Sequence, residues 1–456
     1  MELNDLIKNQ TAYFRAGKTK PISARLDALW RLEKSILRYE DDMYAAFRID
    51  LGKSRAEAYM SEISQVLSEI RYIRRNLRLW ALPRIKPASL STFPARSRIF
   101  PEPYGVVLIL APWNYPLYLA MSPLAGAIAA GNCVVLKCSK SSPNCSDVIK
   151  KIVTFALTPE EAVCVDADTD YDEVLRQNYQ YIFFTGSPRV GKTIMKRAAE
   201  DLIPVSLELG GKSPCIVTST ADLKRAAKRI AWGKFLNAGQ TCISVDYILV
   251  DEKVRESLIY FLEDEIKLRY PDASHNQYYP RIITDGHFER LQSLINNAKA
   301  AGRHVSGGEL NGVERRISPA IIKDASWDDE IMQEEIFGPI LPVISYKHLD
   351  DAVESINDRP HPLATYIFTE DKKLAKKLIN RIPFGGGCVN DTILHIANHN
   401  LPFGGVGNSG MGNYHGKYSF RTFSHMKSVL LNTTKVDIPV RYAPFTDRKW
   451  RLLRKF

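Results

Sequence analysis

The chain reads Val106-Val107-Leu108-Ile109-Leu110 and then Ala111-Pro112-Trp113-Asn114-Tyr115-Pro116, an apolar run that ends in a turn. Five consecutive apolar residues are expected of a strand that is covered on both faces, as in a parallel sheet. The runs Cys133–Leu136 and Tyr181–Phe184 have the same character, and helical patterns separate all three. Such alternation predicts an α/β protein whose parallel sheet is covered by helices on both sides.

Outside this region the patterning changes along the chain. The first 80 residues read as helices, and residues 82–103 are rich in proline and basic residues, which favours an extended connector. A second alternating region has Ile216–Val217 and Tyr247–Val250 as its expected first strands. Eight glycines between residues 382 and 413 predict loops rather than regular helix.

Composition limits the class of protein. A chain of 456 residues with 45% apolar and 25% charged residues is ordinary for a soluble globular protein of two or three domains. No stretch reaches the roughly 18 uninterrupted apolar residues of a membrane span, and the nearest candidate, 117–130, contains Ser122, Pro123 and Gly126. The start lacks a secretory pattern, and seven scattered cysteines favour reduced thiols, so we expect a cytoplasmic protein. We expect no metal, because no pair of Cys or His has zinc-ligand spacing.

The net charge of +11 bears on partners. Part of the excess lies in residues 71–78 and part in the tail 441–456, where basic residues alternate with Trp450, Leu452 and Phe456. Such a tail suits peripheral contact with an anionic membrane surface, and a solvated or docked terminus is the alternative. No recognition motif accompanies the charge, so nucleic acid is not an expected partner.

Five separated segments combine a thiol, an amide and carboxylates, each among small residues. They are Asn237-Ala238-Gly239-Gln240-Thr241-Cys242, Pro112–Pro116, Leu207-Glu208-Leu209-Gly210-Gly211-Lys212, Gln333–Pro339 and Leu401–Gly407. Together they resemble the aldehyde dehydrogenase superfamily, which oxidises aldehydes to acids with NAD or NADP. The resemblance covers nearly the whole chain, and the short length and final third are most similar to the class 3 branch.

The resemblance implies the aldehyde dehydrogenase fold, with a Rossmann-like cofactor domain, an α/β catalytic domain and a small bridging element. The implied boundaries are 1–81 and 104–208 for the cofactor-binding domain, 209–392 for the catalytic domain, 82–103 and 393–440 for the bridging and oligomerisation segments, and 441–456 for the basic tail. Class 3 members are mostly dimers, so the resemblance also implies a homodimer.

Three residues are the expected catalytic groups. Cys242 matches the family's nucleophile segment, and its small neighbours leave room for a substrate and a nicotinamide ring. Glu208 ends the apolar run 205–207, where burial raises a carboxyl pKa towards that of a general base, and the family assigns it to activate water. The Asn114 amide is a donor suited to an oxyanion, with the Cys242 backbone N–H as the second donor in the family pattern.

The expected cofactor residues come from three places in the chain. The turn 185–191 joins a strand to a helix start, where Gly186, Ser187 and Gly191 suit a pyrophosphate near the helix N-terminus. The resemblance implies that Glu335 binds the nicotinamide ribose, and that Phe337 and Trp113 lie on the cofactor side. It also implies that Lys137 contacts the adenosine ribose.

Lys140 departs from the family pattern. Most class 3 relatives read Lys-Pro-Ser-Glu where this chain has Lys137-Cys138-Ser139-Lys140. A carboxylate there opposes a 2′-phosphate and an ammonium attracts one, so we hypothesise that NADP is accepted and preferred. The alternative is that Lys140 points to solvent.

The implied reaction is oxidation of an aromatic or a medium- or long-chain aliphatic aldehyde through a thiohemiacetal and a thioester on Cys242. We expect a substrate funnel lined from Tyr115, Leu119 and the residues near Ile393. Two alternatives stay open. One is a CoA-acylating dehydrogenase, which the retained Glu208 disfavours, and the other is a non-catalytic protein that keeps the fold.

Overall fold

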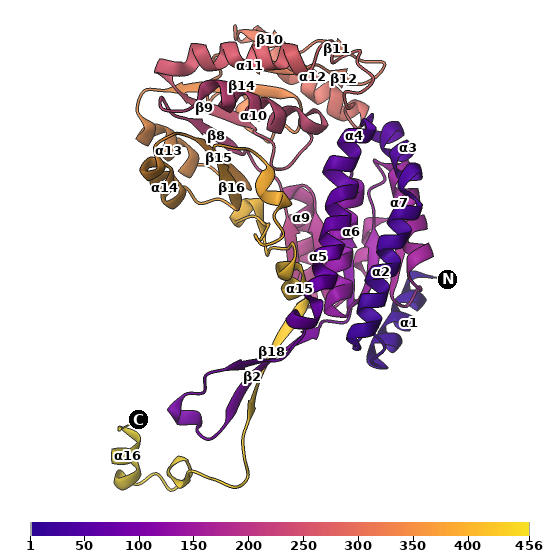
Figure 1. Ribbon diagram of the computed structural model, residues 1–456, viewed down its shortest axis with the longest axis vertical. Helices are drawn as coiled ribbons and strands as arrows, with labels where there is room; N and C mark the ends of the chain where they lie inside the picture. The colour runs from indigo at the N-terminus through magenta and orange to yellow at the C-terminus, as the bar shows by residue number, and fades with distance from the viewer. Residues whose placement is uncertain (1, 456) are drawn as a thin grey trace.

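Two α/β lobes and a projecting ribbon of strands make up the protein (Figure 1). The structure is a computed structural model, and it describes residues 2–455. The first lobe carries both the N-terminal helices and a six-stranded sheet, and the second lobe carries a seven-stranded sheet. Among residues 2–455, no helix combines the length and the apolar character needed to span a bilayer.

The sheet of the first lobe has the strand order β17-β7-β6-β3-β4-β5. All its pairings are parallel except that of the short β17 with β7. The strands are β3 (Val106–Leu110), β4 (Cys133–Lys137), β5 (Ala162–Val165), β6 (Tyr181–Thr185), β7 (Val205–Glu208) and β17 (Gly410–Met411). The predicted α/β class and its first three buried strands are thereby confirmed.

Helices cover this sheet. They are α1 (Leu3–Arg15), α2 (Ile22–Arg38), α3 (Glu40–Leu51), α4 (Arg55–Ala58), the π-helix η1 (Tyr59–Ile63), α5 (Ser64–Trp80), α6 (Pro116–Ala130), α7 (Pro143–Ala156), α8 (Tyr171–Leu175) and α9 (Pro188–Glu200). Every residue of α6 is buried, since the helix packs against α5 on one side and β3 and β4 on the other. The prediction of a buried helix rather than a membrane span at 117–130 is confirmed.

The sheet of the second lobe has the order β10-β13-β14-β9-β8-β15-β16, and only the β10 edge is antiparallel. Its strands are β8 (Pro214–Val217), β9 (Tyr247–Asp251), β10 (Val305–Gly307), β13 (Ala320–Ile322), β14 (Ile340–Tyr346), β15 (Ala364–Phe368) and β16 (Gly386–Val389), beside a small hairpin of β11 (Leu310–Asn311) and β12 (Arg316–Ile317). Its helices are α10 (Leu223–Phe235), α11 (Arg255–Arg269), α12 (Asp285–Ala300), α13 (Leu349–Asn357) and α14 (Lys372–Arg381).

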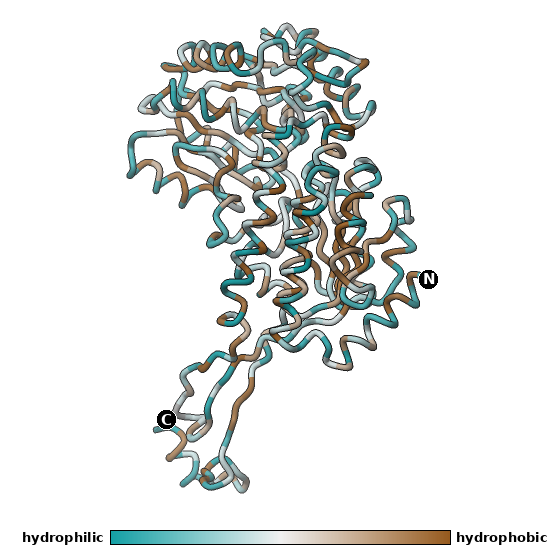
Figure 2. Tube along the Cα trace, turned by 45° about the vertical axis from the view of Figure 1, so that its right-hand side comes forward, coloured by the Kyte–Doolittle hydropathy of each residue, from teal (hydrophilic) through white to brown (hydrophobic). Residues whose placement is uncertain are grey.

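The ribbon is a three-stranded antiparallel sheet of β1 (Arg84–Lys86), β2 (Arg96–Pro103) and β18 (Ser424–Leu431). It leaves the first lobe, and the short α16 (Asp447–Leu453) follows beyond its far end (Figure 1). Figure 2 shows apolar stretches inside both lobes and also along this ribbon. The extended conformation predicted for 82–103 is correct. The pairing of this segment with β18 was not predicted from the sequence.

The glycine-rich segment 382–413 is mostly loop, as predicted, but it also contributes the short strands β16 and β17. It crosses from the second sheet to the first, and α15 (Lys417–Thr422) then packs on α6. The domain boundaries expected from the resemblance remain predictions.

Candidate active site

The carboxyl ends of the first sheet's parallel strands meet at one edge. Glu208 is the last residue of β7, the loop with Asn114 follows β3, and Gly186 and Ser187 follow β6. In open parallel sheets, ligands bind at this edge. Three groups of predicted site residues therefore come from neighbouring strands.

A cavity of about 150 Å³ opens between the lobes at this edge. Cys242 and Glu208 both line it, and so do Tyr115, Leu119 and Ile393. Most of the remaining wall is apolar, with Trp232, Leu236 and Phe403 among its members. The residues expected to line a substrate funnel thus line this cavity, and its use by a substrate stays a prediction.

Cys242 follows a turn of unusual backbone. Asn237, Ala238 and Gly239 have φ values of 52°, 51° and 74°, so three consecutive residues adopt the left-handed conformation. Only glycine reaches it without strain, and a Cβ on Gly239 would collide with the carbonyl oxygen of Gly338. The turn brings the nucleophile segment against the loop that carries Phe337.

The thiol of Cys242 is protonated near neutral pH in the protein without ligands. Burial, together with the nearby Glu335 and Glu208 carboxyl groups, raises its pKa to about 12. A thiolate is the nucleophilic form, so Cys242 needs a base or a nearby cation to react.

Glu208 is buried, and neither of its carboxyl oxygens has a hydrogen-bond partner among the described residues. Burial raises its pKa well above the ordinary value of a glutamate. A carboxyl group with a raised pKa that lines a cavity is suited to exchange a proton with a substrate or a water molecule.

Asn114 is buried between the two loops. Its Nδ2 donates to the carbonyl oxygen of Gln240 at 3.1 Å, which uses one of its two amide hydrogens. Tyr115 and Thr241 link the same loops through their hydroxyl groups at 2.7 Å. The amide and the Cys242 segment are thus held in one rigid unit.

At the start of α9, Ser187 is the N-cap residue and accepts from the Val190 N–H at 3.4 Å. The close packing of this turn requires its glycines. A Cβ on Gly186 would lie 2.5 Å from the Phe184 ring, and one on Gly191 2.7 Å from the Leu209 side chain. In the first turn Pro188 has no N–H, and the Val190 and Gly191 N–H groups are bonded to Ser187, so the Arg189 N–H is the one left to meet an anion.

Glu335 lies across the site from this helix and packs directly over Gly210, where a Cβ would collide with its carboxyl group. Burial, together with the charge of Asp246, raises its pKa to about 8. Phe337 has a φ of 49° and contacts Trp113 edge to face, with 5.4 Å between ring centroids. The structure therefore brings Trp113, Glu335 and Phe337 to one side of the site.

Lys137 and Lys140 lie at the end of β4. The Lys137 ammonium donates to the Ala167 carbonyl at 2.7 Å and lies over the Tyr171 ring. Burial lowers its pKa, and the charge of Lys140 contributes in the same direction. Lys140 itself is exposed, which leaves its ammonium free to meet either solvent or a ligand.

Sequence reasoning missed a layer of buried polar groups behind the site. Lys53, Glu57 and Glu62 contact the loops of Asn114 and Cys242 from the helices α3 to η1. One local signal was present, because Glu62 falls at helical spacing from the buried Val66 and Ile73. Among residues 2–455, no group of three or more His, Cys, Asp or Glu side chains is arranged to hold a metal.

Comparisons with known proteins agree with this geometry. Residues 1–429 match the sequence model described as "Aldehyde dehydrogenase family". The 4,4'-diaponeurosporen-aldehyde dehydrogenase of Staphylococcus aureus (strain NCTC 8325 / PS 47) is 44% identical over 447 residues, which are 98% of this chain and 97% of that protein. An "aldehyde dehydrogenase, dimeric NADP-preferring" of Canis lupus familiaris is 40% identical over 97% of this chain and 98% of its own length.

The solved structure described as the substrate-bound state of Staphylococcus aureus AldH superposes with a TM-score of 0.96 at 42% identity. It covers all of this chain, which in turn covers 99% of that chain. The similarity therefore extends over both lobes and the ribbon.

Proposed function

The chain belongs to the aldehyde dehydrogenase family, and we propose that it oxidises its aldehyde substrate through a covalent bond to Cys242. The observation that carries this proposal is the single cavity lined by both Cys242 and Glu208. The protein is an NAD- or NADP-dependent oxidoreductase that acts on the aldehyde group. The roles of individual residues are our proposal.

In the proposed mechanism, a water molecule takes the proton of the Cys242 thiol, and the sulfur forms a bond to the aldehyde carbon as the carbon–oxygen π bond breaks. The free hydrogen of the Asn114 amide donates to the resulting oxyanion. Removing one oxyanion donor typically costs about 100- to 1000-fold in turnover. NAD or NADP, when bound, would supply the oxidation as a hydride acceptor. Glu208 takes a proton from the water that hydrolyses the Cys242 thioester, which releases the acid and restores the thiol.

The residues at the site fit a dinucleotide. The close packing of Gly210 against Glu335 leaves a carboxyl group at the surface of the site, and the start of α9 offers the Arg189 N–H and the positive end of the helix dipole to a pyrophosphate. We assign Gly186, Ser187 and Gly191 to the phosphates, and Glu335 with Trp113 and Phe337 to the nicotinamide end. Lys137 and Lys140 are assigned to the adenosine end.

We propose that NADP is preferred, because the exposed Lys140 ammonium attracts the 2′-phosphate. The NADP-preferring relative is consistent with this choice. Lys140→Glu should raise KM for NADP and lower it for NAD, with little change in kcat. If the substitution leaves the ratio of the two KM values unchanged, Lys140 points to solvent and does not contact the cofactor.

The apolar cavity wall supports aromatic and medium- or long-chain aliphatic aldehydes as substrates. The test is absorbance at 340 nm with benzaldehyde and hexanal, each with NAD and NADP, for the unsubstituted protein and Cys242→Ala. Reduced cofactor should form only with the intact thiol. Activity that requires added CoA would establish acyl transfer to CoA instead, and activity that survives Cys242→Ala would refute the covalent mechanism.

We further propose a cytoplasmic homodimer. All seven cysteines are free thiols, which suits a reducing compartment, and a relative is named as dimeric. The tail is proposed to touch anionic membrane surfaces, because α16 exposes Trp450, Leu452 and Leu453 beside basic residues. Sedimentation with anionic liposomes, with and without residues 440–456, tests the tail.

A further inference from the structure

Lys53 and Glu62 form an ion pair that is wholly buried behind the candidate active site. The Lys53 Nζ lies 2.5 Å from the Glu62 Oε1, and both side chains are fully excluded from solvent. Lys53 comes two residues after α3, and Glu62 belongs to η1. Burying two charges costs free energy unless further hydrogen bonds satisfy the donors and acceptors that the ion pair itself leaves unpaired. The other contacts of the pair therefore indicate what it holds in place.

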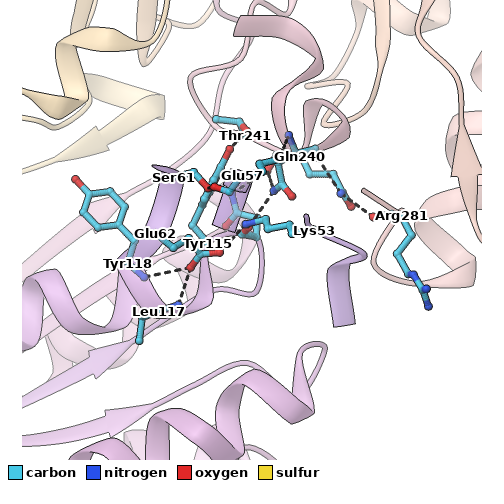
Figure 3. Close-up of polar contacts among 12 residues, drawn as sticks. Lys53, Glu57, Ser61, Glu62, Tyr115, Leu117, Tyr118, Gln240, Thr241 and Arg281 are labelled. Carbon is cyan, nitrogen blue, oxygen red and sulfur yellow. Dashed lines mark hydrogen bonds and ion pairs between the residues drawn. The ribbon is translucent and has the colours of Figure 1, made fainter. Parts of the chain in front are cut away.

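The remaining hydrogen bonds of the pair fall on one loop and the helix that follows it. The Lys53 ammonium donates to the backbone carbonyl of Asn114 at 3.0 Å and lies 4.2 Å from the centre of the Tyr115 ring. The second Glu62 oxygen accepts from the N–H groups of Leu117 at 2.9 Å and Tyr118 at 3.3 Å, in the first turn of α6 (Figure 3). The pair thus fixes the backbone at Asn114 itself and just beyond it.

A second set of contacts ties the same carbonyl to the nucleophile segment. The Asn237 Nδ2 donates to the Asn114 carbonyl at 2.9 Å and to the Gln240 carbonyl at 3.2 Å. The half-buried Glu57 accepts from the Asn237 backbone N–H at 2.7 Å, at the start of the left-handed turn. The Asn114 side chain also donates to Gln240, so hydrogen bonds link Asn114, Asn237 and Gln240 in a closed ring.

We propose that Lys53, paired with Glu62, is a positioning residue that aims the Asn114 amide at the oxyanion, an inference that rests on the proposed role of Asn114. Lys53 does not line the cavity, so it acts on the site through the Asn114 backbone and the neighbouring Tyr115 ring. A displacement of about 1 Å in a catalytic donor costs on the order of 100-fold in rate. A charge-assisted hydrogen bond to the carbonyl resists such a displacement.

The test separates this role from a purely structural one. Lys53→Met alone would leave Glu62 buried and unpaired, so the informative variant is Lys53→Met/Glu62→Gln, whose amide oxygen still accepts from the Leu117 N–H. Its kcat is compared in two backgrounds, with Asn114 intact and with Asn114→Ala. We expect kcat to fall about 100-fold in the first background and no more than about threefold in the second, because the two changes act on one group.

KM for the aldehyde and the rate at which iodoacetamide alkylates Cys242 should stay at their unsubstituted values. The matched control is Glu161→Gln, which removes the carboxylate that pairs with Arg31 at 2.7 Å. Glu161 precedes β5 at the opposite end of the first sheet, so its loss should lower the melting temperature and leave kcat unchanged.

An equal loss of kcat in both backgrounds, or a folded double variant with unaltered kcat, would overturn the inference. If Lys53→Met/Glu62→Gln does not fold, Lys53→Met and Asn114→Ala are compared in the same cycle. A lack of aldehyde oxidation by the unsubstituted protein is a different result, since it would count against the proposed function itself.

Discussion

Glu208 presents two buried carboxyl oxygens to the cavity, and neither accepts a hydrogen bond from a described residue. A structural carboxylate is normally paired, so this arrangement suits a group whose partner is a transient water molecule. We predict that Glu208→Gln keeps the first hydride transfer and slows hydrolysis. Rapid mixing should show a burst of one reduced cofactor per active site, followed by a steady rate about 100- to 10,000-fold lower.

Cys242→Ala is the control for this burst, because it lacks the group that becomes acylated. A Glu208→Gln variant that loses the burst together with the steady rate would show that Glu208 is needed before hydride transfer. In that case the carboxyl group deprotonates the thiol, and its assignment to water would be wrong.

Glu335 gives a prediction for stability as a function of pH. Burial, followed by the charge of Asp246, raises its pKa from 4.5 to about 8 in the folded protein. The folded state therefore holds the Glu335 proton more tightly than the unfolded state. Protonation of Glu335 thus stabilises the folded protein at low pH, and this stabilisation is lost as pH rises from about 4.5 through 8. Glu335→Gln has no proton to lose. Its melting temperature without cofactor should exceed that of the unsubstituted protein by a margin that grows up to pH 8 and is then constant.

The margin should reach several degrees, as about 1 kcal/mol moves the melting temperature of a large domain by about 2–4 °C. Differential scanning fluorimetry across pH 5 to 9 measures it, and Glu334→Gln, an exposed neighbour, is the control. A margin that is the same at every pH would show that Glu335 does not titrate in this interval.

The residues at and behind the candidate site differ in how far the sequence reveals them. Cys242, Glu208 and Asn114 lie in segments whose small and polar neighbours mark them, and the structure brings Cys242 and Glu208 to one cavity. No neighbouring residues of this kind distinguish Lys53 in the sequence, and a lysine after a helix end is normally solvated. Its burial depends on Glu62 and on the loop of Asn114, which are brought together only by the fold.

At the scale of elements, the turn 237–239 sets the position of the nucleophile segment. Gly239 has a φ of 74°, and a Cβ there would collide with the carbonyl of Gly338, in the loop that carries Phe337. We predict that Gly239→Ala lowers stability by about 1–3 kcal/mol and raises KM for the cofactor, because it pushes these two loops apart. Chemical denaturation and initial rates measure the two effects.

The matched control is Gly286→Ala. Gly286 lies in the first turn of α12, where a Cβ would meet nothing within 4 Å. The substitution should be neutral or stabilise the protein by up to about 1 kcal/mol, since alanine is the better helix former. Equal effects of the two substitutions would contradict the collision at Gly239.

Strands and their partners are not equally predictable from sequence. Continuous apolar runs predict β3, β4 and β6 to within one residue, because burial on both faces leaves a local signal. The pairing of β2 with β18 joins segments from distant parts of the chain. Likewise, the two-residue strand β17 pairs with β7 in the sheet of the first lobe. Such pairings depend on how the loops cross between lobes, which no local periodicity encodes.

For the whole molecule, the site depends on both lobes together. Glu208 and Asn114 come from the first lobe, and Cys242 and Glu335 come from the second. The polar network of Asn114, Gln240 and Asn237 joins these parts directly. The site is therefore fixed by contacts between the lobes, and changes at this boundary should alter turnover even where they do not touch the substrate.

The projecting ribbon carries the last prediction. β18 is an edge strand that exposes Leu430 and Leu431, and Phe93 is exposed beside the start of β2. Free apolar edges of this kind promote association, and burying them between two copies accounts for the proposed homodimer. We predict that Leu430→Lys shifts the molar mass measured by size exclusion with light scattering from two chains towards one. Val313→Lys, a change at a 94% exposed apolar residue on the hairpin of the second lobe, should leave the dimer intact. A dimer that survives Leu430→Lys at low protein concentration would place the interface away from the ribbon.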